Sequence, residues 1–151
     1  MAESPAVVLA ELKVPASAEF ISVAKRVASS LGVKLGFGLD EVDEISIAVA
    51  QACSGSIESA EEMWGAGATL KLSYSSTGAG IAVDVEALAP TSKEALSLPR
   101  RQPVRRSSPG VEAAERALAE AMISLFVDEL RHQVDASRRQ IRYRMVKYLV
   151  S

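Results

Sequence analysis

Two segments with helical spacing follow a first strand, and this order limits the folds that the chain can adopt. Apolar residues dominate 6–14 and stop at Pro15, as expected for a strand that runs into a turn. In 17–31 and 40–62 they recur every three or four residues, which predicts two amphipathic helices. Gly32 is expected to end the first of them.

The rest of the chain adds a hairpin, a third helix and a second hairpin. Alternation in 70–74 and 81–85 around a Ser/Gly-rich turn predicts the first hairpin. Residues 111–130 predict a helix with an inward face made of Ala114, Leu118, Ala121, Met122, Leu125 and Phe126. Short strands in 133–136 and 140–150 complete the chain. This order predicts an α/β two-layer sandwich, with a mixed, mostly antiparallel sheet and three helices on one face.

Residues 87–110 separate the hairpin from the third helix. Four prolines and the arginine-rich stretch 100–106 fit no regular element, so we expect a mobile, basic, lid-like loop. The chain has 151 residues and no internal repeat, which predicts a single domain over 1–151.

Composition excludes several classes of protein. Cys53 and His132 are the single cysteine and histidine, so a disulfide framework or a cysteine-cluster zinc site is excluded, and we expect no metal and a cytoplasmic location. We find no apolar run long enough for a membrane span and no signal peptide, so we expect neither membrane insertion nor export. The net charge is −7 up to residue 92 and +5 beyond it. This charge split fits a nucleic-acid-binding protein, a protein with an acidic partner, or a protein with two solvated faces. Nucleic acid would bind at the basic stretches 100–106 and 138–147, but the low aromatic content of 5% disfavours this alternative.

Several motifs together resemble the bacterial anti-sigma factor serine kinases of the RsbW and SpoIIAB type. They are Val14-Pro15-Ala16-Ser17-Ala18-Glu19-Phe20, Asp43 to Ser54, Arg101-Gln102-Pro103, Phe126 to Leu130 and Lys147-Tyr148-Leu149. The resemblance implies the histidine-kinase-like ATPase (Bergerat) fold and a homodimer formed through the N-terminal strand and first helix. It also implies partners: a sigma factor and a STAS-type anti-sigma antagonist, which the family phosphorylates on serine with ATP and magnesium.

The family's nucleotide-site residues are replaced in this sequence. The glutamate base corresponds to Gln51, the magnesium-binding asparagine to Gly55, the adenine-binding Asp-x-Gly pair to Ala87 and Ala89, and the phosphate-binding Gly-x-Gly pair to Ala117 and Ala119. An amide is no general base, and glycine offers no side-chain oxygen to a cation. The neighbouring Glu86 should point to the opposite face of its strand. We therefore expect a pseudokinase with no catalytic residue and no bound cofactor.

Alternatives remain open at this stage. An active serine kinase would need ATP, magnesium and a replacement base such as Glu58 or Glu44. Lys25 and Arg26 fit either a solvated helix face or a partner-binding surface, and Trp64 fits a partner anchor or a plug at a helix end. Cys53 is expected to be a buried thiol, and His132 to cap the end of the third helix.

Overall fold

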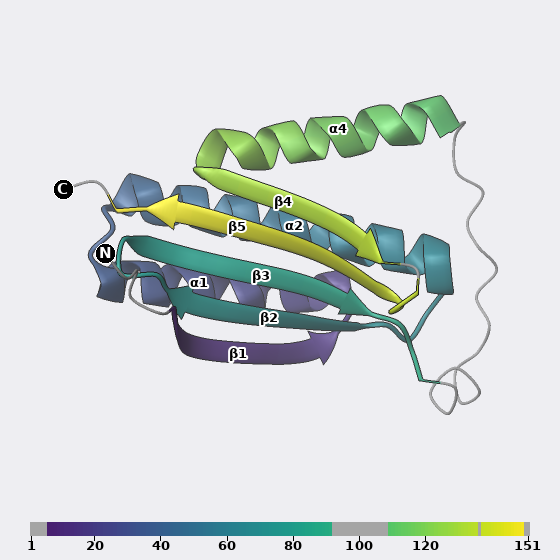
Figure 1. The fold of residues 1–151 in the computed structure, drawn as a ribbon, viewed down its shortest axis with the longest axis horizontal. Helices are drawn as coiled ribbons and strands as arrows, with labels where there is room; N and C mark the ends of the chain where they lie inside the picture. Colours follow the sequence, from purple (N-terminus) through teal and green to yellow (C-terminus); the bar gives the residue numbers. More distant parts are fainter. Residues whose placement is uncertain (1–5, 92–108, 136, 150–151) are drawn as a thin grey trace.

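The computed structural model describes residues 6–91, 109–135 and 137–149 (Figure 1). The elements in chain order are β1 (Val7–Pro15), the short 3-10 helix η1 (Ala18–Phe20), α1 (Ile21–Leu35), α2 (Leu39–Trp64), β2 (Thr69–Ser76), β3 (Gly80–Leu88), α4 (Pro109–Phe126), β4 (Glu129–Asp135) and β5 (Gln140–Tyr148). Both predicted hairpins and all three predicted helices are therefore present.

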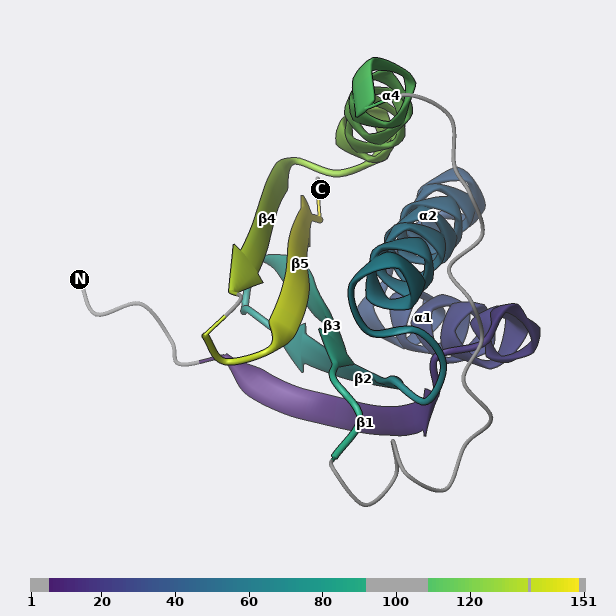
Figure 2. The same cartoon turned by 90° about the vertical axis from the view of Figure 1, so that its right-hand side faces the viewer.

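The five strands form one sheet in the order β1-β2-β3-β5-β4, so β1 and β4 are its edges. All four pairings between the described strands are antiparallel, so the sheet is not mixed. The three helices lie on one side of it, with α4 near β4 and far from β1 (Figure 2). The predicted two-layer α/β sandwich with three helices is confirmed.

The core lies between this sheet and α1 and α2. Leu70, Leu72 and Tyr74 alternate inward along β2 and are fully buried. The Tyr74 hydroxyl donates a hydrogen bond of 2.8 Å to the Ala24 carbonyl, which ties β2 to α1. Cys53 on α2 is fully buried, and its burial raises the pKa of the thiol to about 12. The prediction of a buried structural thiol is confirmed.

The predicted end of the first helix at Gly32 is wrong. Helix α1 continues to Leu35 and ends at Gly36, whose φ of +96° lies in the left-handed region that glycine tolerates best. Gly32 stays inside the helix because α2 packs closely there: an added Cβ would lie 3.2 Å from Val42 Cγ2. Its small size serves contact between two helices rather than termination.

The predicted end and inward face of the third helix are also wrong. Helix α4 ends at Phe126 and β4 begins at Glu129, so His132 lies in a strand. Among the side chains of α4 that the structure describes, Ile123 is fully buried and Phe126 is half-buried. The other residues expected to face inward are exposed: Ala114, Leu118, Ala121, Met122 and Leu125. The apolar periodicity identified a stripe on this helix, but the helix packs on α2 through a different side.

Most of the predicted loop 87–110 lies outside the described residues. Strand β3 continues to Leu88 and α4 begins at Pro109, so the two ends of that range are regular structure. The arginine-rich stretch 100–106 is among the residues that are not described. Within the described ranges, no helix combines the length and the apolar character needed to cross a bilayer.

Candidate functional site

Gln51 and Gly55 lie one turn apart on α2. Gln51 is half-buried, and Gly55 faces β5. A Cβ built on Gly55 would lie only 3.0 Å from the Tyr143 hydroxyl oxygen and 3.6 Å from Tyr143 Cζ. At the position where the resemblance implies a magnesium-binding side chain, a tyrosine from the sheet therefore fills the space beside the helix.

Tyr143 is held in place by its neighbour on β4. His132 and Tyr143 are cross-strand partners, and their rings stack with centroids 4.2 Å apart and planes 10° from parallel. His132 Nδ1 lies 2.7 Å from Glu120 Oε1 on α4. These contacts join α2, β5, β4 and α4, so Gly55 and Glu120 lie at the two ends of one chain of contacts. His132 therefore does not cap the helix end, contrary to the sequence prediction.

Ala87 lies in a closed apolar cluster. It is fully buried on β3 together with Ala60, Ala68 and Ile141, and Trp64 packs against this group from the end of α2. Of the two interpretations of Trp64, this contact favours the plug at the helix end. Position 87, which the resemblance aligns with the family's adenine-binding aspartate, is thus part of the hydrophobic core.

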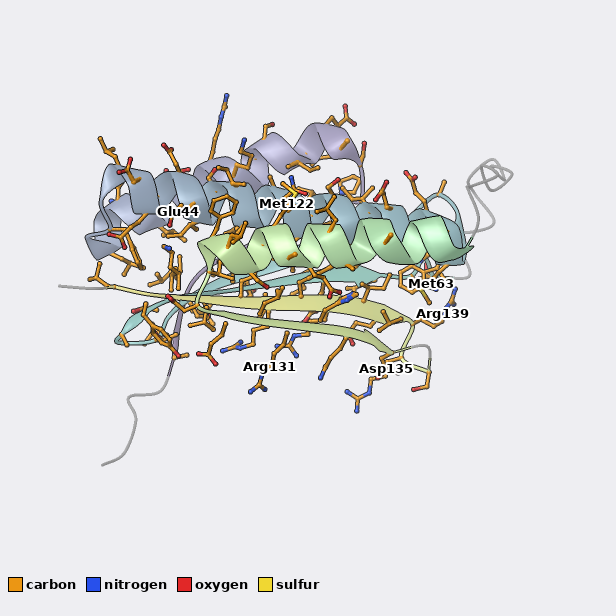
Figure 3. The ribbon with its side chains drawn as sticks, turned by 90° about the horizontal axis from the view of Figure 1, so that it is seen from above. Glu44, Met63, Met122, Arg131, Asp135 and Arg139 are labelled. Atoms are coloured by element: carbon orange, nitrogen blue, oxygen red, sulfur yellow. The ribbon has the colours of Figure 1, made fainter. Side chains whose placement is uncertain are left out.

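Glu86 lies on the opposite, open face of the sheet, as predicted. Its carboxylate is 3.7 Å from the Arg142 guanidinium. Beside it Asp84, which is 8% exposed, accepts 2.8 Å hydrogen bonds from Arg142 and Arg144 on β5. The hydrogen bond to Asp84 raises the pKa of Arg142. This network holds β3 to β5 on the face of the sheet that carries no helix. Arg131 of β4, the cross-strand partner of Arg144, also projects away from the helices there (Figure 3).

The remaining predicted positions offer no free backbone donors. The Ala89 amide donates to the Arg139 carbonyl at 3.2 Å. Ala117 is exposed and Ala119 half-buried in the uninterrupted helix α4. Because both lie beyond the first turn, their N–H groups are used within the helix. A phosphate cradle requires free N–H groups, as at a helix N-terminus.

The two replacement bases lie apart from Gly55 or in solvent. Glu44 Oε2 is 2.9 Å from Lys147 Nζ, and it lies about 16 Å from Gly55 along the helix axis. Glu58 is exposed one turn beyond Gly55 and has an interaction of its own. Among the described residues, no three His, Cys, Asp or Glu side chains converge on a metal-sized site.

Sequence reasoning missed the residues that now fill the region. Tyr143, Glu120 and Asp84 belong to no motif. The alternation of Ile141, Tyr143 and Met145 is the one signal that could have indicated that Tyr143 lies on the buried side of its strand. Lys25 and Arg26 are exposed on α1, which fits a solvated face as well as a partner surface.

Comparison with known proteins gives partial matches to one kind of kinase. The chain is 36% identical over 64 residues to the serine-protein kinase RsbW of Halalkalibacterium halodurans, and this match covers 42% of the chain and 38% of the relative. It is 32% identical over 50 residues to the serine-protein kinase RsbW of Bacillus subtilis, covering 33% and 31%. The chain thus aligns with less than two-fifths of these relatives. No family model matches it.

The resemblance is partial. It agrees with the architecture, since an antiparallel five-stranded sheet covered by three helices is consistent with the histidine-kinase-like ATPase fold. The nucleotide chemistry depends on individual residues, and at those positions this chain has Gln51, Gly55 and Ala87.

Proposed function

We propose that this chain is a pseudokinase that acts as an anti-sigma-factor-like regulator. It binds a sigma factor, a STAS-type anti-sigma antagonist or both, and it transfers no phosphate. The partial matches to RsbW kinases support the anti-sigma role. The observation that carries the loss of chemistry is the Tyr143 hydroxyl, which packs against Gly55 where a magnesium ligand would stand.

The residues present do not fit ATP and magnesium. Gln51 cannot accept a proton as a base, and Gly55 has no ligand oxygen. An adenine amino group needs a hydrogen-bond acceptor, but Ala87 offers a methyl group inside an apolar cluster. We therefore assign no step to a nucleotide and no catalytic role to any residue.

In this proposal the protein binds its protein partners in the bacterial cytoplasm and thereby regulates transcription, for example in a stress response. Lys25 and Arg26 are neighbouring exposed cations on α1 and are our candidates for the partner surface. Such cations act mainly on association rate and specificity toward an acidic partner.

Capture of partners from the native host tests this function. Tagged protein is expected to retain a sigma factor or an antagonist-like protein equally with and without Mg-ATP, and Lys25→Glu with Arg26→Glu is expected to weaken retention at least tenfold. Lys34→Glu, at another exposed cation of α1, serves as the matched control. Retention that requires ATP, or recovery of no such protein, would contradict the proposal.

We also propose a homodimer that forms through the edge strand β1. Val7 is 59% exposed and Val8 54% exposed there, and an uncovered apolar edge strand favours pairing with another chain. Sedimentation equilibrium at tens of micromolar is expected to give the dimer mass, and Val8→Lys to give the monomer mass. Val134→Lys on the other edge strand is the control and should leave the dimer intact. A monomeric unmodified protein would refute this assembly.

The second candidate function is an active serine-protein kinase, because the relatives that the chain matches carry that name. It requires ATP, magnesium and a base such as Glu58 or Glu44. The ion pair of Glu44 with Lys147 makes Glu44 the weaker of the two.

A further inference from the structure

Helix α4 carries an apolar stripe that faces solvent. Leu118 is 63% exposed, Met122 37% and Leu125 79%, and Ala114 and Ala121 beside them are also exposed. Ile123, on the other side of the helix, is fully buried. The helix therefore has two apolar sides, and the core uses only one of them.

The stripe has the spacing of a coiled-coil seam. Ala114, Leu118, Ala121 and Leu125 are separated by 4, 3 and 4 residues. This is the alternation of heptad a and d positions, with leucine at both a positions and alanine at both d positions. A surface with this spacing is suited to another helix rather than to a loop or a small ligand.

The order of large and small residues selects the partner. In an antiparallel pair of two identical helices, an a position of one helix packs beside a d position of the other. Leu118 then lies opposite Ala121 of the second copy, and Leu125 lies opposite Ala114. Each layer contains one leucine and one alanine, so the stripe is complementary to itself about a twofold axis. A parallel pair would stack leucine on leucine and alanine on alanine, with uneven spacing.

We propose that α4 pairs antiparallel with α4 of a second copy of this chain. The g positions that flank the stripe on one side, Ala117 and Ser124, are uncharged, so self-pairing brings no like charges together on that side. A stable interface buries about 1,200–2,000 Å² of accessible surface, and a single pair of helices buries less. The contact is therefore weak alone, and a second interface would strengthen it through effective concentration.

Such a second interface has room to form. Helix α4 lies beside β4, at the sheet edge opposite β1 (Figure 2). The α4 pair therefore does not compete with a dimer formed through β1. Because the α4 contact is weak, assemblies larger than the β1 dimer are expected only above the tens of micromolar at which that dimer is measured. The α4 pair itself goes beyond the proposed function and does not depend on it.

Disulfide trapping tests the pairing and its direction. Two preparations, Ala114→Cys and Leu125→Cys, are mixed at about 100 μM and oxidised. The native Cys53 is fully buried and does not compete. In the antiparallel pair, residue 114 lies opposite residue 125 of the other copy, whereas two residues 114 are about 16 Å apart along the axis. The mixed dimer is expected to exceed either like dimer at least tenfold.

Leu118→Glu in both preparations is expected to abolish this mixed dimer without lowering the melting temperature. Val8→Lys, which is expected to disrupt pairing through β1, should leave the 114–125 crosslink detectable. The experiment therefore distinguishes failure of the β1 interface from failure of the α4 interface. Dominant 114–114 crosslinks would overturn the antiparallel pair. So would the lack of any crosslink, as for a helix that binds only another protein. A lower melting temperature of the Leu118→Glu monomer would instead show that another segment of the same chain covers the stripe.

Discussion

An aspartate in place of Ala87 is expected to lower the free energy of unfolding by about 4 kcal/mol and to create no ATP binding. Ala87 is fully buried among Ala60, Ala68 and Ile141, and this group provides no donor for a carboxylate. A buried charge without a partner is one of the most destabilising changes in a protein. The family residue at this position would therefore disrupt the core rather than complete a site.

Urea unfolding followed by circular dichroism measures this effect. The matched control is Ala89→Asp, two residues further on and half-buried, which is expected to cost about 1 kcal/mol or less. An Ala87→Asp protein that is as stable as the unmodified chain and binds ATP would show that the pocket is open and that only one side chain is missing.

The pair Gln51→Glu and Gly55→Asn is expected to restore no magnesium-dependent ATP turnover. The new Cβ at position 55 would lie 3.0 Å from the Tyr143 hydroxyl oxygen, closer than side chains normally approach. Overpacking of this kind costs about 1–3 kcal/mol, which outweighs the few tenths gained in helix propensity. Gly55→Asn alone should therefore destabilise the protein, whereas Gln51→Glu alone should change its stability little.

A double-mutant cycle with Tyr143→Phe isolates the cause. This change removes the oxygen that lies nearest to position 55, and the next atom, Tyr143 Cζ, is 3.6 Å away. Gly55→Asn is then expected to cost at least about 1 kcal/mol less than it does beside tyrosine. An equal cost in both backgrounds would mean that Tyr143 does not fill this space.

Local patterns predicted the elements well and their packing poorly. Alternation located β2 and β3, because the apolar residues that face the helices recur at every second position of a strand, although most other residues of β3 are buried as well. Gly32 was misread as a helix end, since its role depends on Val42 of another helix. The apolar stripe on α4 was real, but an amphipathic pattern does not say whether a helix presents that side to its own core or to a partner.

The candidate site was predictable only as a set of replaced positions. That Gln51 and Gly55 lack an acid and a ligand oxygen follows from the sequence. That Tyr143 fills the space beside Gly55 does not, because these residues are far apart in the chain and meet only when β5 pairs with β3 beneath α2. The stacking of His132 on Tyr143 likewise depends on the register of β4 with β5.

Calorimetric titration of the unmodified protein with Mg-ATP tests the central claim most directly. With Tyr143 against Gly55 and Ala87 in the core, we predict no saturable heat at ATP concentrations up to about 1 mM, where even a weak site of about −4 kcal/mol would respond. Saturable binding of Mg-ATP, followed by transfer of its terminal phosphate to a serine of a captured partner, would contradict the pseudokinase and establish the kinase.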